Sequence, residues 1–220
     1  MPCFDLIAFD ADDTLWHNEP LYERPQARLA DLLAAYGVEK SSVEERLYQT
    51  ESRNIQVFGY GIKSFTLSMI EAGVELSEGR LSGRDALAII QLAREQRNSP
   101  VELLEHVTGT IARLATLYQL MIITKGDLFD QETKMARSGL GDYFKDIEVV
   151  SDKTPQSYAR LFRNHSLEPS RLVMVGNSLR SDILPVLELG GYAVYIPYHI
   201  TWQHEAAEAP APSTPRFSQL

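Results

Sequence analysis

The sequence predicts an α/β fold, in which a three-layer core with a parallel sheet carries an all-helical domain inserted after the first strand. One observation is the alternation of short apolar runs with amphipathic segments of ten or more residues, which is typical of βαβ units. A second is region 17–98, where helical patterns follow one another without a convincing strand. A third is a set of polar motifs where the apolar runs end, as at the ligand-binding edge of an open α/β sheet.

The predicted strands are short apolar runs, as expected for strands that are buried on both faces of a sheet. They occupy residues 6–9, 120–124, 147–150, 172–175 and 193–196. Because crossovers between parallel strands are right-handed, the carboxyl ends of these strands should meet at one edge.

Amphipathic patterns predict the helices that connect these strands and those that build the insert. In the sheet domain they cover 101–117, 128–138, 155–164 and 183–189, and in the insert they cover 21–36, 43–55, 62–72 and 85–97. We therefore assign 1–16 and 99–204 to the sheet domain and 17–98 to the helical domain. The tail, 205–220, is rich in Ala, Pro and Ser and is expected to be flexible.

The composition predicts a soluble globular protein, with 44% hydrophobic and 23% charged residues in a chain of 220. A net charge of -9 argues against nucleic acid or an anionic membrane as the partner, although a local cation can still attract a small anionic substrate. No apolar stretch approaches the roughly 18 residues that span a bilayer, and no signal segment is recognisable at the N-terminus. Cys3 is the only cysteine, which excludes an internal disulfide, and we expect a cytoplasmic monomer or homodimer.

Three carboxylates, Asp10, Asp12 and Asp13, come directly after the first predicted strand. Such a cluster would be costly inside a core, but it suits the carboxyl edge of a parallel sheet. Two residues apart in an extended segment, Asp10 and Asp12 would lie on the same side.

Three further motifs follow the next three predicted strands. They are Thr124-Lys125-Gly126-Asp127, then Lys153 within 151–155, and then the segment from Gly176-Asn177-Ser178 to Asp182. Each motif alone is weak evidence. All of them in this order, on one edge of a sheet, indicate a catalytic site.

These motifs resemble those of the haloacid dehalogenase-like hydrolase superfamily, most of whose members are phosphatases. The Asp-x-Asp-x-Thr of 10–14, Thr124, Lys153 and the Gly-Asn…Asp of 176–182 match the four motifs of that family. The resemblance covers the sheet domain and implies a Rossmann-like core. The insert lies where that family carries a helical cap, which would close over the site and select the substrate.

The resemblance implies Mg²⁺-dependent hydrolysis of a small phosphorylated metabolite. Asp10 would be the nucleophile that forms an aspartyl-phosphate, and Asp12 would act first as general acid and then as general base. Lys153 would neutralise charge on the nucleophile and the phosphoryl oxygens, which is what attack on an anionic ester requires. The Thr124 hydroxyl and the N–H groups near Lys125 and Gly126 would hold phosphate oxygens.

The expected metal ligands are the Asp10 carboxylate, the Asp12 backbone carbonyl, and either Asn177 or Asp182. Many members of the family have Asp where this chain has Asn177. An amide oxygen can still bind Mg²⁺, but it brings no charge, so we expect weaker metal affinity rather than loss of function.

Three alternative functions remain open at this stage. A 2-haloacid dehalogenase would use Asp10 against carbon, but it would need neither a metal nor the acid at Asp12. A phosphosugar mutase would pass the phosphoryl group to a second hydroxyl. A regulatory protein would use the fold without catalysis.

Overall fold

The structure is a computed structural model that describes residues 4–200, 202 and 205–220; Cys3 lies outside this range. In the described part of the chain, no helix is both long and apolar enough to cross a membrane. Contacts between residues divide the chain into two units, each of which is described separately below. The sheet unit runs through His17 and resumes with Val101–Lys125 and Gln131–Leu220, and the helical unit comprises Asn18–Pro100 and Gly126–Asp130.

A parallel sheet forms the centre of the sheet unit, as predicted, and its strand order is β3-β2-β1-β4-β5-β6. The strands are β1 (Leu6–Phe9), β2 (Gln119–Lys125), β3 (Asp146–Val150), β4 (Leu172–Gly176), β5 (Tyr192–Tyr195) and β6 (Phe217–Gln219). β1 lies between β2 and β4, with Ile7 opposite Leu120 on one side and Val173 on the other. The three motif-bearing loops after β1, β2 and β4 are therefore neighbours at the carboxyl edge.

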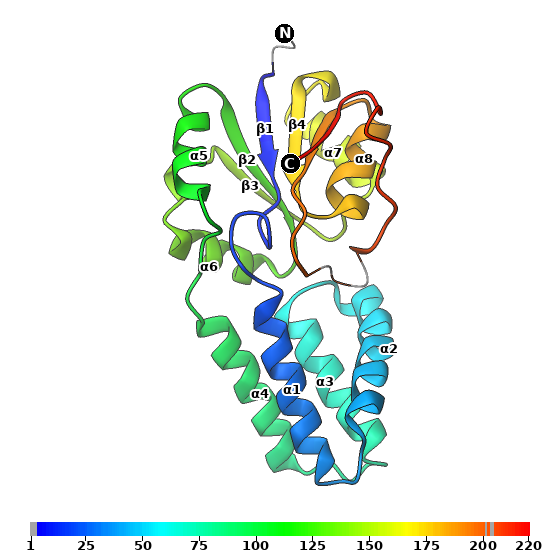
Figure 1. Ribbon diagram of the computed structural model, residues 1–220. Helices are drawn as coiled ribbons and strands as arrows, with labels where there is room; N and C mark the ends of the chain where they lie inside the picture. The colour runs from blue at the N-terminus through cyan, green and yellow to red at the C-terminus, as the bar shows by residue number, and fades with distance from the viewer. Residues whose placement is uncertain (1–3, 201, 203–204) are drawn as a thin grey trace. The chain divides into compact units, whose positions relative to one another are not determined.

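Helices cover both faces of this sheet, which confirms the three layers (Figure 1). Ile7 and Phe9 of β1 pack on one face with residues of α5 (Val107–Ala115) and α6 (Leu128–Ser138). Leu6 and Ala8 point to the other face, which α7 (Pro155–Asn164) and α8 (Leu184–Glu188) cover. This alternation follows from the two-residue period of a strand.

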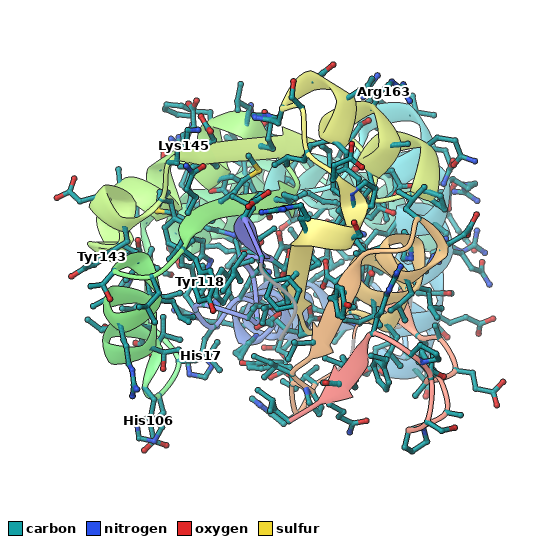
Figure 2. The ribbon with its side chains drawn as sticks, turned by 90° about the horizontal axis from the view of Figure 1, so that it is seen from above. His17, His106, Tyr118, Tyr143, Lys145 and Arg163 are labelled. Carbon is teal, nitrogen blue, oxygen red and sulfur yellow. The ribbon has the colours of Figure 1, made fainter. Side chains whose placement is uncertain are left out.

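Figure 2 shows the same two sides from above: Tyr143 lies on the side of α5, and Arg163 of α7 lies on the opposite side.

Two helices of the sheet unit differ from the prediction. The helix expected over 101–117 begins only at Val107, because Leu103 forms an antiparallel bridge with Trp16 and the Leu104 N–H donates to the Leu15 carbonyl. The helix expected over 183–189 is preceded by a π-helical segment over Leu179–Ile183. In the first of these places, contacts with a segment distant in sequence override the local apolar pattern.

A sixth strand, β6, lies in the tail that the composition predicted to be flexible. β6 pairs in parallel with β5, with Ala193 opposite Phe217. It has only three residues, and its partner is distant in sequence, so the Ala- and Pro-rich composition before it carries no sign of this pairing.

The helical unit contains α1 (Pro20–Ala34), α2 (Lys40–Phe58), α3 (Ile62–Leu76) and α4 (Gly83–Asn98), near the ranges that the amphipathic patterns predicted. Its core is formed by apolar side chains from each helix, among them Leu29, Leu47, Phe65 and Ile89. α4 begins with a capping box, in which the Ser82 hydroxyl accepts from the Asp85 N–H.

We expect that Ile122→Ala lowers the free energy of unfolding of the sheet unit by about 2–5 kcal/mol, because it leaves a cavity in the centre of the sheet. Ile122 is buried in β2 within the cluster that contains Ile7 and Phe9. Leu117→Ala, at an exposed position in the same unit, is the matched control and should change stability little. Urea unfolding of both variants measures the difference, and equal effects would contradict this description of the core.

Candidate active site

The chain turns sharply after β1, and this turn brings Asp10 and Thr14 together. The Asp10 N–H donates to the Val175 carbonyl of β4 at 2.9 Å, which continues the sheet hydrogen bonding past the end of β1. Asp13 then adopts a left-handed conformation with φ of 60°, and the Leu15 N–H donates back to the Ala11 carbonyl at 2.8 Å. As a result the Thr14 hydroxyl donates to Asp10 Oδ2 at 3.2 Å.

Lys153 lies between two carboxylates at the centre of the site. Its Nζ donates to Asp10 Oδ1 at 2.5 Å and to Asp182 Oδ1 at 2.6 Å. All three residues are buried, and a buried charge requires such partners because it has lost its hydration. Burial raises the pKa of Asp10 to about 7, against the lowering by Lys153, and Asp182 and Asp12 raise it further. Burial by itself would lower the pKa of Lys153, but the two carboxylates raise it above its ordinary value.

The sequence around Lys153 explains why this lysine is well placed. Thr154 and Ser157 form a capping box, and Pro155 occupies the first turn, so α7 begins immediately after Lys153. The Lys153 N–H donates to its neighbour Asp152 at 2.9 Å. These contacts fix the backbone from which the lysine reaches back into the site.

Asp182 supports Lys153 from behind. While Oδ1 accepts from the lysine, Oδ2 accepts from the Ser178 N–H at 2.9 Å. Both oxygens are therefore engaged, and Asp182 lies in the π-helical segment with no exposed surface.

Asn177 is the fourth-motif residue that meets Asp10 and Asp12. With its amide nitrogen turned toward them, Asn177 lies 3.2 Å from both Asp10 Oδ2 and the Asp12 backbone carbonyl. If the amide oxygen of Asn177 faces Asp10 and Asp12 instead, it accepts from the Thr14 hydroxyl at 3.0 Å. Three oxygens then converge, namely Asp10 Oδ2, the Asp12 carbonyl and the Asn177 amide oxygen.

A divalent cation fits this convergence of oxygens. A carboxylate, a backbone carbonyl and an amide oxygen are hard donors of the kind that Mg²⁺ prefers, and a cation between them would allow the amide oxygen of Asn177, rather than its nitrogen, to face the other two oxygens. The described residues contain no group of three or more His, Cys, Asp or Glu that could hold a metal, so a cation at this site would depend on the backbone carbonyl and the amide oxygen as well. Of the two candidates for the last ligand, Asn177 rather than Asp182 lies against Asp10 Oδ2 and the Asp12 carbonyl.

The Asp12 side chain has three donors of its own. It accepts from Trp16 Nε1 at 2.7 Å, from Gln131 Nε2 at 2.8 Å and from Lys134 Nζ at 3.0 Å. Gln131 and Lys134 lie three residues apart on α6 and were not predicted from the sequence. Polar residues at that spacing are also typical of a solvated helix face, so the sequence offers no signal that separates the two cases.

The contacts of the second motif are with the loop after β4 and with the tail rather than with Asp10. Thr124 is buried at the end of β2, and its hydroxyl donates to the Lys125 carbonyl at 3.2 Å. Lys125 Nζ donates to the Ser181 hydroxyl at 2.8 Å and forms an ion pair with Glu205. Gly126 has φ of 126° and belongs to the helical unit, so the role expected for its N–H stays a prediction.

Glu205, in the C-terminal tail, was also missed from the sequence. Its carboxylate accepts from Lys125 Nζ and from the hydroxyls of Ser178 and Ser181. Burial favours a higher pKa for Glu205, but Lys125 and the two hydroxyls hold it below its ordinary value. A single Glu in an Ala- and Pro-rich tail carries no local sign of such a role.

We expect that Gly176→Ala disrupts the support of Lys153, since a Cβ at this position overlaps the Asp182 carboxylate. The variant should lose about 1–3 kcal/mol of stability, as is usual for overpacking a buried site. Gly141→Ala, where a Cβ has open space, is the control. Thermal unfolding compares the two, and a Gly176→Ala protein as stable as the control would contradict the close packing of Asp182.

Comparison with known proteins gives one family and several structural relatives. A family model described as haloacid dehalogenase-like hydrolase matches residues 4–190. The crystal structure of a haloacid dehalogenase-like family hydrolase from Xanthomonas campestris is 41% identical, with a TM-score of 0.86 over 100% of this chain and 91% of that one. The HAD-hydrolase YfnB from Bacillus subtilis, solved with bound magnesium, has a TM-score of 0.63 over 88% of this chain and 89% of that one. It is 18% identical and therefore shows the fold alone.

A curated relative matches over a shorter region. It is the glyceraldehyde 3-phosphate phosphatase of Pyrococcus furiosus, 29% identical over 110 residues, and the match covers 46% of each chain. This chain thus spans about half the length of that relative. The solved structures that match also include a 2-haloacid dehalogenase from Pseudomonas syringae at 23% identity, with a TM-score of 0.61 over 99% of this chain and 94% of that one.

Proposed function

Because the chain belongs to the haloacid dehalogenase-like hydrolases, we propose that it is a Mg²⁺-dependent phosphatase that hydrolyses a small phosphorylated metabolite. The observation that carries this proposal is that two carboxylates, Asp10 and Asp12, follow β1 directly and have different partners. Asp10 is paired with the buried Lys153, while Asp12, two residues on, has separate donors. Two carboxylates in different environments suit two roles, a nucleophile and an acid–base group.

Asp10 attacks the phosphorus atom and forms an aspartyl-phosphate, and the alcohol leaves. Asp12 donates a proton to the leaving oxygen, and it then takes a proton from the water that hydrolyses the aspartyl-phosphate. Lys153 favours the ionised form of Asp10 before attack and neutralises charge on the phosphoryl oxygens during attack.

Asp10 Oδ2, the Asp12 carbonyl and the Asn177 amide oxygen are the groups that would hold Mg²⁺. The ion supplies charge neutralisation between the acidic site and the anionic phosphate, and it favours the carboxylate form of Asp10. The magnesium-bound neighbour and the three converging oxygens support this assignment.

Dehalogenation is the second candidate, since 2-haloacid dehalogenases share this fold. In that reaction Asp10 attacks carbon and releases halide, and no acid is needed because halide leaves without a proton. The presence of a second carboxylate at Asp12, which dehalogenation does not need, together with the phosphatase among the curated relatives, favours phosphate transfer to water.

We expect that the wild-type protein, screened with Mg²⁺ against phosphorylated metabolites, releases phosphate and that Asp10→Asn reduces this release to background. The amide cannot form the aspartyl-phosphate. Asp142→Asn, which removes an exposed carboxylate of the sheet unit, is the control and should keep wild-type activity. Thermal unfolding checks that Asp10→Asn remains folded.

Other products in this screen would contradict the proposal in distinct ways. Halide release from a 2-haloacid without phosphate release would identify a dehalogenase. Transfer of the phosphoryl group to a second sugar hydroxyl would identify a mutase. Activity that survives Asp10→Asn would exclude Asp10 as the nucleophile.

Asn177→Asp should lower the Mg²⁺ concentration for half-maximal activity by roughly tenfold, because a charged ligand replaces a neutral one. Asn177→Ala should raise the same concentration, since it removes the ligand. Mg²⁺ titrations at saturating ester measure both effects. If neither variant shifts the Mg²⁺ requirement, Asn177 is not a metal ligand.

A further inference from the structure

The C-terminal tail reaches the carboxyl edge of the sheet through one carboxylate. Glu205 accepts from Lys125 Nζ, from the Ser178 hydroxyl and from the Ser181 hydroxyl, the last at 2.5 Å. Lys125 follows Thr124 at the end of β2, whereas Ser178 and Ser181 lie after β4. A single side chain thus joins the two loops that flank the loop carrying Asp10.

The contacts of Glu205 lead on to Lys153. The hydroxyl of Ser178 donates to Glu205, and the N–H of the same residue donates to Asp182 Oδ2 at 2.9 Å. Asp182 in turn accepts from Lys153, which also pairs with Asp10. A movement of the Ser178 backbone would therefore change the position of the lysine beside the nucleophile.

The pair of Lys125 and Glu205 is well enclosed, with 13% of each side chain exposed. Removal of one partner from such a pair leaves the other charge poorly solvated, so the remaining group must move or recruit a new partner. Lys125 also donates to the Ser181 hydroxyl at 2.8 Å, so that a released lysine would disturb both loops at once.

We propose that Glu205 is a positioning residue, which acts through Lys125 and Ser178 to hold the β2 and β4 loops at the spacing that phosphate binding requires. The proposal rests on the proposed function, because Lys153, which Ser178 and Asp182 support, is the group assigned there to the phosphoryl oxygens. It makes the tail part of the catalytic apparatus, although Glu205 does not itself react.

If Glu205 competed with phosphate instead of positioning the loops, removal of its charge would change the phosphate affinity in the opposite direction. Lys125 and the two hydroxyls are also donors that an anion could use, and a Glu205 that merely occupied them would compete with phosphate. Removal of its charge would then strengthen phosphate binding. If Glu205 positions the loops, removal of its charge weakens phosphate binding instead.

The test compares Glu205→Gln with Glu208→Gln, which removes an equal charge from an exposed position three residues on. Isothermal titration calorimetry with inorganic phosphate, at fixed Mg²⁺, measures binding without turnover. Steady-state kinetics on the most active ester separate KM from kcat. We expect a roughly tenfold weaker phosphate affinity and a similarly raised KM for Glu205→Gln, and wild-type values for Glu208→Gln. Thermal unfolding shows whether each variant is folded.

A double-mutant cycle with Lys125→Met tests whether Glu205 affects phosphate binding through Lys125. If Glu205 acts mainly through Lys125, Glu205→Gln adds little in the Lys125→Met background. Unchanged affinity and KM in Glu205→Gln, tighter phosphate binding, or full additivity with Lys125→Met would each overturn the proposal. A wild-type protein that binds phosphate but hydrolyses no ester would overturn the proposed function alone, and the affinity comparison would still decide the role of Glu205.

Discussion

A lysine buried between two carboxylates is the constraint on which the rest of this site depends. Lys153 has 1% of its side chain exposed and cannot remain charged there without Asp10 and Asp182 in contact. These residues come from three separate segments, namely the end of β1, the loop before α7 and the π-helical segment after β4. Their meeting therefore fixes how three loops are arranged, and Gly176 is needed where a Cβ would displace Asp182.

The sheet explains why this charge cluster can exist in a folded chain. Within β1 the residues are apolar and buried, and the polar groups begin only where the strand ends. Because β1 lies between β2 and β4, Asp10 is flanked by both neighbouring loops. The desolvation that raises the pKa of Asp10 also strengthens the attraction between its carboxylate and Lys153. Burial therefore disfavours the charge on Asp10 and, at the same time, holds the ion pair together.

The acidic groups of the site are each held by different elements. Lys153 pairs with Asp10, Lys134 of α6 pairs with Asp12, and Lys125 of β2 pairs with Glu205 of the tail. These pairs keep carboxylates of like charge in fixed and separate positions. A chain with a net charge of -9 thus places three lysines among the carboxylates at this edge of the sheet.

The sequence by itself determined the fold class, the first five strands and the motif residues that follow them. Those features depend on local order: apolar runs of strand length, helical periodicity and polar residues at strand ends are visible in a few consecutive positions. Tertiary structure alone decided which side chains hold the motif residues. Gln131 and Lys134 resemble a solvated helix face, Glu205 and β6 lie in a tail of unremarkable composition, and α5 starts late because Trp16 meets Leu103. The difference between Asn177 and Asp182 also needed the fold. Both follow the same strand, and only three-dimensional contacts show that Asn177 faces Asp10 whereas Asp182 supports Lys153.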